Sequence, residues 1–174
     1  MTRLSRFNRC LKGPWVTSGL DVQWRWKGNV LTFQCTKSEQ DWLFNFTAFS
    51  AKVGGDSVHA GYAALWLSVV HDIDYAVGST EGFVIEGYSM GGALAQLAFR
   101  HFRDRKPMGT VFGSPKVFSG KVDIPNLENI QVHGDLFTLL PPWFRRAGLS
   151  IRLGKKPLFP SPLFHAPESY RSNL

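Results

Sequence analysis

A serine lies between two glycines in the pentapeptide Gly-Tyr-Ser-Met-Gly at residues 87–91, and this is the stretch best suited to chemistry. Residues 82–86 read as a short strand, and residues 92–102 are dense in Ala and Leu, as in a helix. A sharp strand-to-helix turn brings the backbone on either side of the serine together, so glycines are needed there. The pentapeptide alone also fits a plain surface turn, but the flanking strand and helix favour Ser89 as a nucleophile.

A serine hydroxyl becomes a good nucleophile only when a base takes its proton and an acid orients that base. On such a turn the expected order along the chain is serine, acid, histidine. Asp135 follows a predicted strand, where an acid loop should emerge, and His165 lies in the last loop. His101 lies on the helix that leads away from Ser89, and His133 precedes the best acid. The sequence favours Asp135 and His165, against the alternatives of a turn-forming aspartate and an ordinary loop histidine.

The elements that must position these residues alternate between strands and helices. We expect a β-hairpin over residues 22–35, a helix over 59–71, a strand ending in a turn over 108–115, and strands over 129–133 and 149–153. A short helix is also expected near residues 36–46, and the proline-rich tail, 155–174, reads as irregular. This order predicts an α/β fold: a three-layer sandwich with a mostly parallel central sheet, in one domain over 1–174.

The composition is basic, with twenty Lys and Arg against thirteen Asp and Glu, which gives a net charge of +7. Basic proteins favour anionic partners, and no nucleic-acid-binding motif is present, so no nucleic acid partner is expected. Arg3, Arg6, Arg9 and Lys12 are spaced three apart, which on a helix makes a basic face suited to peripheral contact with an anionic membrane surface. The alternative is a short solvated helix or a frayed arm.

Several other classes of chemistry have no support in the sequence. Cys10 and Cys35 form no metal-binding pair, and neither a P-loop nor an H-E-x-x-H motif is present, so no cofactor and no metal are expected. No apolar run approaches the ~20 residues of a membrane span. The start of the chain has basic residues without an apolar core after them, unlike a signal peptide. The default expectation is a cytoplasmic protein, with extracellular release left open.

Seven segments together resemble the class 3 (fungal-type) lipase family of α/β-hydrolases, and they occur in the order of that family. Before the serine, residues 31–36 resemble its oxyanion strand, 41–45 its D-W segment and 58–62 its V-H-x-G-F segment. From the serine onward, residues 89–95 resemble its serine turn, 113–117 its G-S-P-R-V segment, 135–142 its acid loop and 164–168 its histidine segment. The resemblance implies that Ser89 is the nucleophile, Asp135 the orienting acid and His165 the general base. It also implies an oxyanion hole formed by the backbone N–H groups of Thr36 and Met90.

The resemblance also implies a lid or an apolar rim over the site. The segment at the place of the family's lid is 37–46, and its apolar side chains, with Tyr88, are candidates for substrate contact; they are Trp42, Leu43, Phe44 and Phe46. The alternative is that these aromatic side chains are plain core. The sequence departs from the family where Cys35 replaces a glycine and Tyr88 a histidine, and the chain is shorter than fungal members.

The expected function is a serine carboxylic-ester hydrolase, a lipase or esterase, that acts through an acyl-enzyme on acylglycerols or related acyl esters. Two alternatives remain open: a phospholipase A-type acyl hydrolase, and a non-catalytic lipid-surface binding protein with a vestigial triad. Residues 143–146, Trp-Phe-Arg-Arg, combine aromatic and cationic side chains and suit either a lipid headgroup boundary or a solvated loop.

Overall fold

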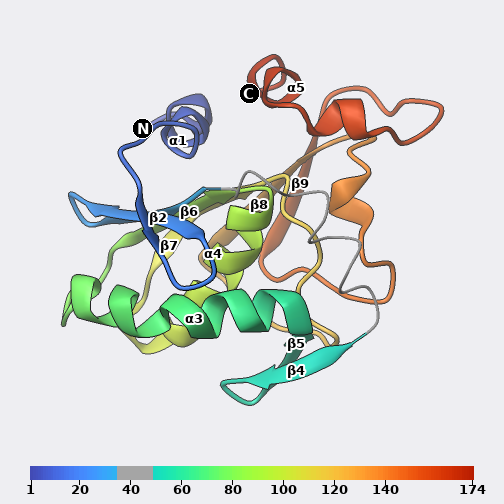
Figure 1. Ribbon diagram of the computed structural model, residues 1–174. Helices are drawn as coiled ribbons and strands as arrows, with labels where there is room; N and C mark the ends of the chain where they lie inside the picture. Colours follow the sequence, from blue (N-terminus) through green and yellow to red (C-terminus); the bar gives the residue numbers. More distant parts are fainter. Residues whose placement is uncertain (35–48) are drawn as a thin grey trace.

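The computed structural model describes residues 1–34 and 49–174 (Figure 1). A seven-stranded sheet runs through it in the order β1-β2-β3-β6-β7-β8-β9. Strands β3, β6, β7, β8 and β9 are parallel, while β1 and β2 add an antiparallel edge. The strands are β1 (Val16–Ser18), β2 (Val22–Lys27), β3 (Val30–Phe33), β6 (Val84–Tyr88), β7 (Met108–Phe112), β8 (Leu127–Val132) and β9 (Leu149–Leu153). The expected α/β sandwich with a mostly parallel sheet is confirmed.

Helices cover both faces of this sheet. Helices α3 (Ala60–Val77) and α4 (Met90–His101) lie below it in Figure 1, and α1 (Arg3–Arg9) and α5 (Pro167–Arg171) lie above it. A small hairpin, β4 (Ser50–Val53) and β5 (Asp56–His59), precedes α3. In the described part of the chain, no helix combines the length and the apolarity needed to cross a bilayer.

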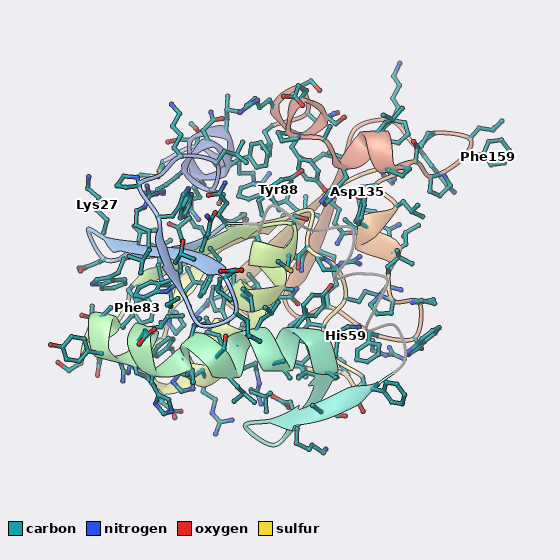
Figure 2. The ribbon with its side chains drawn as sticks, in the orientation of Figure 1. Lys27, His59, Phe83, Tyr88, Asp135 and Phe159 are labelled. Atoms are coloured by element: carbon teal, nitrogen blue, oxygen red, sulfur yellow. The ribbon has the colours of Figure 1, made fainter. Side chains whose placement is uncertain are left out.

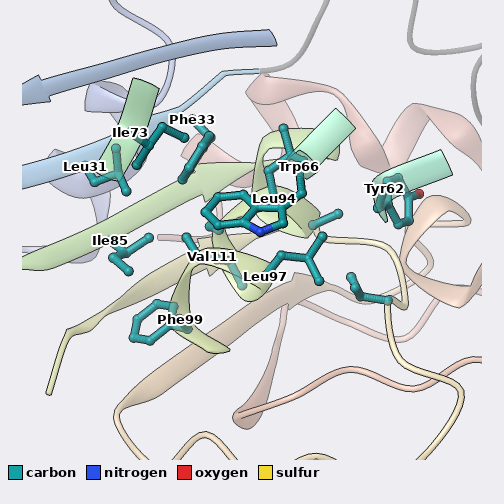
Figure 3. Close-up of a cluster of buried hydrophobic side chains, with 14 of the residues drawn as sticks. Leu31, Phe33, Tyr62, Trp66, Ile73, Ile85, Leu94, Leu97, Phe99 and Val111 are labelled. Atoms are coloured by element: carbon teal, nitrogen blue, oxygen red, sulfur yellow. The ribbon is translucent and has the colours of Figure 1, made fainter. Parts of the chain in front are cut away.

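The larger core lies between the sheet and the α3/α4 layer (Figure 3). The stripe expected on the helix over 59–71 is buried in it, with Leu65, Trp66 and Val69 each 1% exposed. Glycine lets α4 approach the sheet closely: a Cβ on Gly91 would lie 2.6 Å from the Phe33 carbonyl oxygen, and one on Gly92 2.8 Å from Ser114 Cβ. Small residues on α4 therefore fix how near the helix comes to the strands.

The second core, on the α1/α5 face, is smaller and aromatic. Phe7 of α1 is fully buried, with its ring centroid 5.2 Å from that of Tyr88, 5.2 Å from that of Phe112 and 5.5 Å from that of Tyr170. Edge-to-face and stacked aromatic pairs at such distances stabilise beyond their buried area. The N-terminal helix is therefore part of the folded core.

The arginines of α1 face the sheet. Arg9 donates from Nε and Nη2 to the two carboxylate oxygens of Glu86, both at 2.8 Å, and Arg6 donates to Thr110 Oγ1 at 3.0 Å. Glu86 is completely buried on β6; burial raises the pKa of its carboxyl, and the Arg9 guanidinium opposes that rise. These two arginines, predicted on a solvent-facing basic surface, are thus engaged within the protein.

Some elements differ from the expectation. The helix expected over 59–71 extends as α3 to Val77, where Gly78 ends it at φ +56°. The glycines at 54 and 55 form the turn of the β4–β5 hairpin, with φ +55° and +88°. The tail, expected to be irregular, contains a 3₁₀ turn (Pro162–His165) and α5, each with a proline that fits its first turn. The helix expected near 36–46 lies outside the described residues.

We expect Arg9→Met to lower the free energy of unfolding by about 3 kcal/mol, because it leaves a buried carboxylate without its ionic partner. Urea unfolding followed by circular dichroism measures this loss. The matched control is Arg3→Met, because Arg3 pairs with Glu128 at 3.2 Å where both side chains are well exposed. This control should cost less than about 1 kcal/mol. Equal losses in the two variants would contradict the role given to Arg9.

Candidate active site

The backbone at Ser89 has the strained geometry expected of a nucleophile on a sharp turn. Its φ is +56° and its ψ −126°, between the end of β6 and the start of α4. A Cβ on Gly87 would lie 2.3 Å from the carbonyl oxygen of Gly91, a distance no side chain tolerates. The two glycines of the pentapeptide are thus required for the turn, as its sequence predicts.

The structure brings Ser89, His165 and Asp135 together. Ser89 Oγ lies 2.6 Å from His165 Nε2, and His165 Nδ1 lies 2.8 Å from Asp135 Oδ2. Ser89 and Asp135 are each 1% exposed and His165 is 6% exposed, so the three groups are shielded from bulk water. Because Nδ1 faces a carboxylate, the imidazole proton belongs there, which leaves Nε2 free to accept the serine proton.

Different elements at the carboxyl edge of the sheet supply the three residues. Ser89 follows β6, Asp135 follows β8, and His165 ends the 3₁₀ turn after β9. The loop that carries His165 is tied to the loop that carries Asp135, because Ser161 N donates to the Gly134 carbonyl at 2.9 Å. Ligands of open α/β sheets bind beyond this edge, so the cluster occupies the usual place for a functional site.

Asp135 is held by more donors than the histidine alone. Tyr170 of α5 donates its hydroxyl to Asp135 Oδ2 at 2.6 Å, and the backbone N–H of Phe137 donates to Oδ1 at 3.0 Å. Burial and the adjacent Asp135 raise the pKa of the Tyr170 phenol well above its ordinary value, so the phenol stays protonated and remains a donor. The role of Tyr170 could not be predicted from the sequence, because a tyrosine five residues after the histidine carries no recognisable signal.

Tyr88 lies behind the histidine. Its ring stacks on the His165 ring, with centroids 5.3 Å apart and planes 19° apart, and its hydroxyl donates to the His165 carbonyl. Tyr88, labelled in Figure 2, is 6% exposed. Its ring packs against that of Phe7, with centroids 5.2 Å apart. Tyr88 is predicted from the sequence to contact substrate; its described neighbours include the histidine and the aromatic core.

One expected oxyanion donor lies within the described residues. Met90 opens α4, and the first N–H groups of a helix have no acceptor within the helix. The positive end of the helix dipole adds to the favourable field at this position. Thr36 lies outside the described residues, as do the expected lid or rim residues, which are Trp42, Leu43, Phe44 and Phe46.

The aromatic and basic residues at 143–146 do not all face solvent. Phe144 is buried, with its ring centroid 5.4 Å from that of His59, while Trp143 is 59% exposed. Arg146 Nε donates to the Ser114 carbonyl at 3.4 Å, and burial with the nearby Arg152 lowers the pKa of Arg146 to about 10. In the described part of the chain no cluster of His, Cys, Asp and Glu is arranged to hold a metal ion.

Comparison with known proteins gives relatives in sequence and in fold, although no protein-family description matches the chain. Secreted mono- and diacylglycerol lipase 1 of Fusarium solani is 36% identical over 100 residues, which cover 51% of this chain and 30% of that protein. Lipase II from Rhizopus niveus superposes with a TM-score of 0.64 at 22% identity, covering 80% of this chain and 64% of the lipase. The lipase of Rhizopus microsporus var. chinensis superposes with a TM-score of 0.64 at 20% identity, covering 82% of this chain and 61% of that lipase.

The chain therefore spans about a third of the length of the curated relative and less than two thirds of these solved lipases. The default expectation of a cytoplasmic protein is wrong on this comparison, because the curated relative is a secreted lipase. That expectation used the first residues of the sequence, which are no guide in a chain that matches only part of a longer relative. The resemblance to the class 3, fungal-type lipases is confirmed in sequence and in fold, and the chain has the α/β-hydrolase fold of that family.

Proposed function

We propose that this chain is a serine carboxylic-ester hydrolase whose catalytic residues are Ser89, His165 and Asp135. The observation that carries the proposal is a pair of hydrogen bonds that share the His165 ring. One joins Ser89 Oγ and His165 Nε2 at 2.6 Å, and the other joins His165 Nδ1 and Asp135 Oδ2 at 2.8 Å. A buried serine, imidazole and carboxylate in this order are the groups that acyl transfer requires.

In the acylation step, Ser89 Oγ attacks the ester carbonyl carbon while its proton moves to His165 Nε2. The carbonyl oxygen becomes an oxyanion, which the N–H of Met90 at the start of α4 stabilises; each donor of this kind contributes a few kcal/mol. The bond from the carbonyl carbon to the alcohol oxygen then breaks, and the alcohol leaves with the proton from His165. Asp135 stays ionised throughout and stabilises the imidazolium that forms in between.

In the deacylation step, a water molecule takes the place of the alcohol. His165 Nε2 accepts a proton from this water, whose oxygen attacks the acyl carbon on Ser89. When the second tetrahedral intermediate collapses, Ser89 Oγ recovers its proton from His165 and the carboxylic acid is released. No group other than these side chains, the backbone donor and water is needed to balance the reaction.

The proposed substrates are acylglycerols or related acyl esters. The name of the Fusarium solani relative, a mono- and diacylglycerol lipase, supports this class, and so does the similarity to fungal lipases in fold. We place phospholipid acyl chains second, because no described feature of the triad selects a phosphate. A hydrolysis profile over a monoacylglycerol, a diacylglycerol, a triacylglycerol and a phosphatidylcholine tests the choice, and a preference for phosphatidylcholine would contradict it.

We expect Ser89→Ala to lower the hydrolysis of p-nitrophenyl esters by about 10⁴-fold or more, because the nucleophile of the acyl-enzyme is lost. Fluorophosphonate labelling should disappear with it, since this probe reacts only with an activated serine. The matched control, Ser79→Ala, removes an exposed serine in the turn after α3 and should leave both readouts unchanged. A parent protein that neither labels nor hydrolyses would instead fit a lipid-binding protein with a vestigial triad.

We expect Tyr170→Phe to lower kcat about tenfold with little change in KM, because it removes one charge-assisted hydrogen bond from Asp135 while the ring stays in place. A carboxylate with fewer donors attracts the protonated imidazole more strongly, so the acidic limb of the pH–rate profile should move to higher pH. A stopped assay over a pH series measures both effects. A drop in kcat without a shift of the acidic limb would assign Tyr170 to packing alone. The control is Tyr75→Phe, which changes a 92% exposed tyrosine and should leave kcat and the acidic limb unchanged.

A further inference from the structure

The segment from the end of β9 into the 3₁₀ turn of His165 presents large apolar side chains to solvent. Leu158 is 88% exposed, Phe159 74% and Leu163 79%. In Figure 2 Phe159 projects from this segment, at the outer edge of the molecule. Prolines at 157, 160 and 162 restrict the backbone around these residues. Clustered exposed apolar side chains of this kind mark a site of interaction rather than an ordinary surface.

The same region concentrates the positive charge of the protein. Between Asp135 and Glu168 the sequence has five cationic residues and no carboxylate, so this stretch carries five of the seven net positive charges; the cations are Arg145, Arg146, Arg152, Lys155 and Lys156. Lys155 and Lys156 are exposed and lie just before Leu158, Phe159 and Leu163, the three apolar residues that we call the tip. Among the described ion pairs, none involves these five residues. Arg146 donates to the Ser114 carbonyl, whereas the other four side chains are exposed.

The tip is joined to the candidate active site. Ser161 forms a bridge with Asp135, and its N–H donates to the Gly134 carbonyl. A hollow of about 160 Å³ lies between the two loops, lined by Asp135, Leu139 and Leu158 among others. His165 follows Phe159 by six residues. A surface that holds the tip would thus lie beside the reacting groups.

We propose that residues 155–163 dock this protein onto an anionic lipid surface. Leu158, Phe159 and Leu163 insert among the acyl chains, while Lys155 and Lys156 pair with anionic headgroups. Apolar side chains with flanking cations are the pattern that binds such interfaces. A protein partner fits less well, because lysine is depleted from protein–protein interfaces. The proposal concerns binding, so it does not depend on the hydrolytic function.

Sedimentation of the 174-residue chain with vesicles tests the proposal, using phosphatidylcholine mixed with phosphatidylserine and phosphatidylcholine alone. We expect the parent to bind the mixed vesicles more tightly. Lys155→Gln/Lys156→Gln should weaken binding to the mixed vesicles about 25-fold, since each lysine near an anionic surface contributes about fivefold. Phe159→Asp/Leu163→Asp should weaken binding to them about 100-fold, because two apolar side chains no longer enter the bilayer.

Matched controls come from other faces of the molecule. Lys27→Gln/Lys121→Gln removes two exposed lysines, of which Lys27 lies at the opposite end from Phe159 in Figure 2. Leu67→Asp/Tyr75→Asp replaces two exposed apolar side chains on α3. Both controls should bind like the parent. A parent that does not sediment, a tip variant that binds normally, or a control that loses as much binding as its tip counterpart would each overturn the proposal.

Fluorophosphonate labelling and hydrolysis of the soluble ester p-nitrophenyl acetate complete the design. The tip variants should keep both at the level of the parent, because they change no residue of the triad. Ser89→Ala should bind vesicles like the parent, because docking needs no nucleophile. Failure of the proposed hydrolysis would therefore leave the vesicle result intact, and failure of docking would leave the soluble-ester result intact. Tip variants that lost soluble-ester hydrolysis as well as vesicle binding would overturn docking as a separate property of the loop.

Discussion

The close approach of β6 and α4 at the serine is the constraint on which the rest of the structure depends. A Cβ on Gly87 would lie 2.3 Å from the Gly91 carbonyl oxygen, so the turn that lifts Ser89 exists only with glycine there. The next strand also has no room for a side chain at one position, since a Cβ on Gly109 of β7 would lie 1.8 Å from the Ile85 carbonyl oxygen. The strained backbone of Ser89 persists because the layers on both sides fix where its neighbours lie.

The site is supported mainly from the α1/α5 face of the sheet. Phe7 packs on Tyr88 and Tyr170, and these two tyrosines hold the His165 carbonyl and the Asp135 carboxylate. Arg9 ties the same helix to Glu86, three residues before Ser89. The N-terminal helix is therefore linked to His165 through Tyr88 and to Asp135 through Tyr170, which couples the position of a short terminal element to the geometry of the reacting groups.

The sequence predicts the elements with a strong local pattern and misses those that depend on a distant partner. The hairpin before residue 35, the buried stripe of α3 and the parallel strands follow from periodicity and turn residues alone. Asp135 and His165 follow from their order after Ser89 and their place after predicted strands. Tyr170 and Phe7 could not be found, because their roles come from contacts across 35 and 81 residues of chain. The ion pair between Arg9 of the basic helix and Glu86 could not be predicted for the same reason, because Glu86 lies in a strand 77 residues away.

The arginines of α1 and the cations between Asp135 and Glu168 lie in different surroundings. The residues next to each group explain the difference. The α1 arginines lie over a polar row that crosses the sheet through Thr32, Glu86, Thr110 and Glu128. The carboxylates of Glu86 and Glu128 and the hydroxyl of Thr110 accept hydrogen bonds from them. Burial of Glu86 requires such a partner, since an unpaired carboxylate on a central strand would be costly. Between Asp135 and Glu168 the chain has five cationic residues and no acidic residue. Arg146 of this group donates to the Ser114 carbonyl, and the other four side chains are exposed, so the positive charge on this edge is carried at the surface.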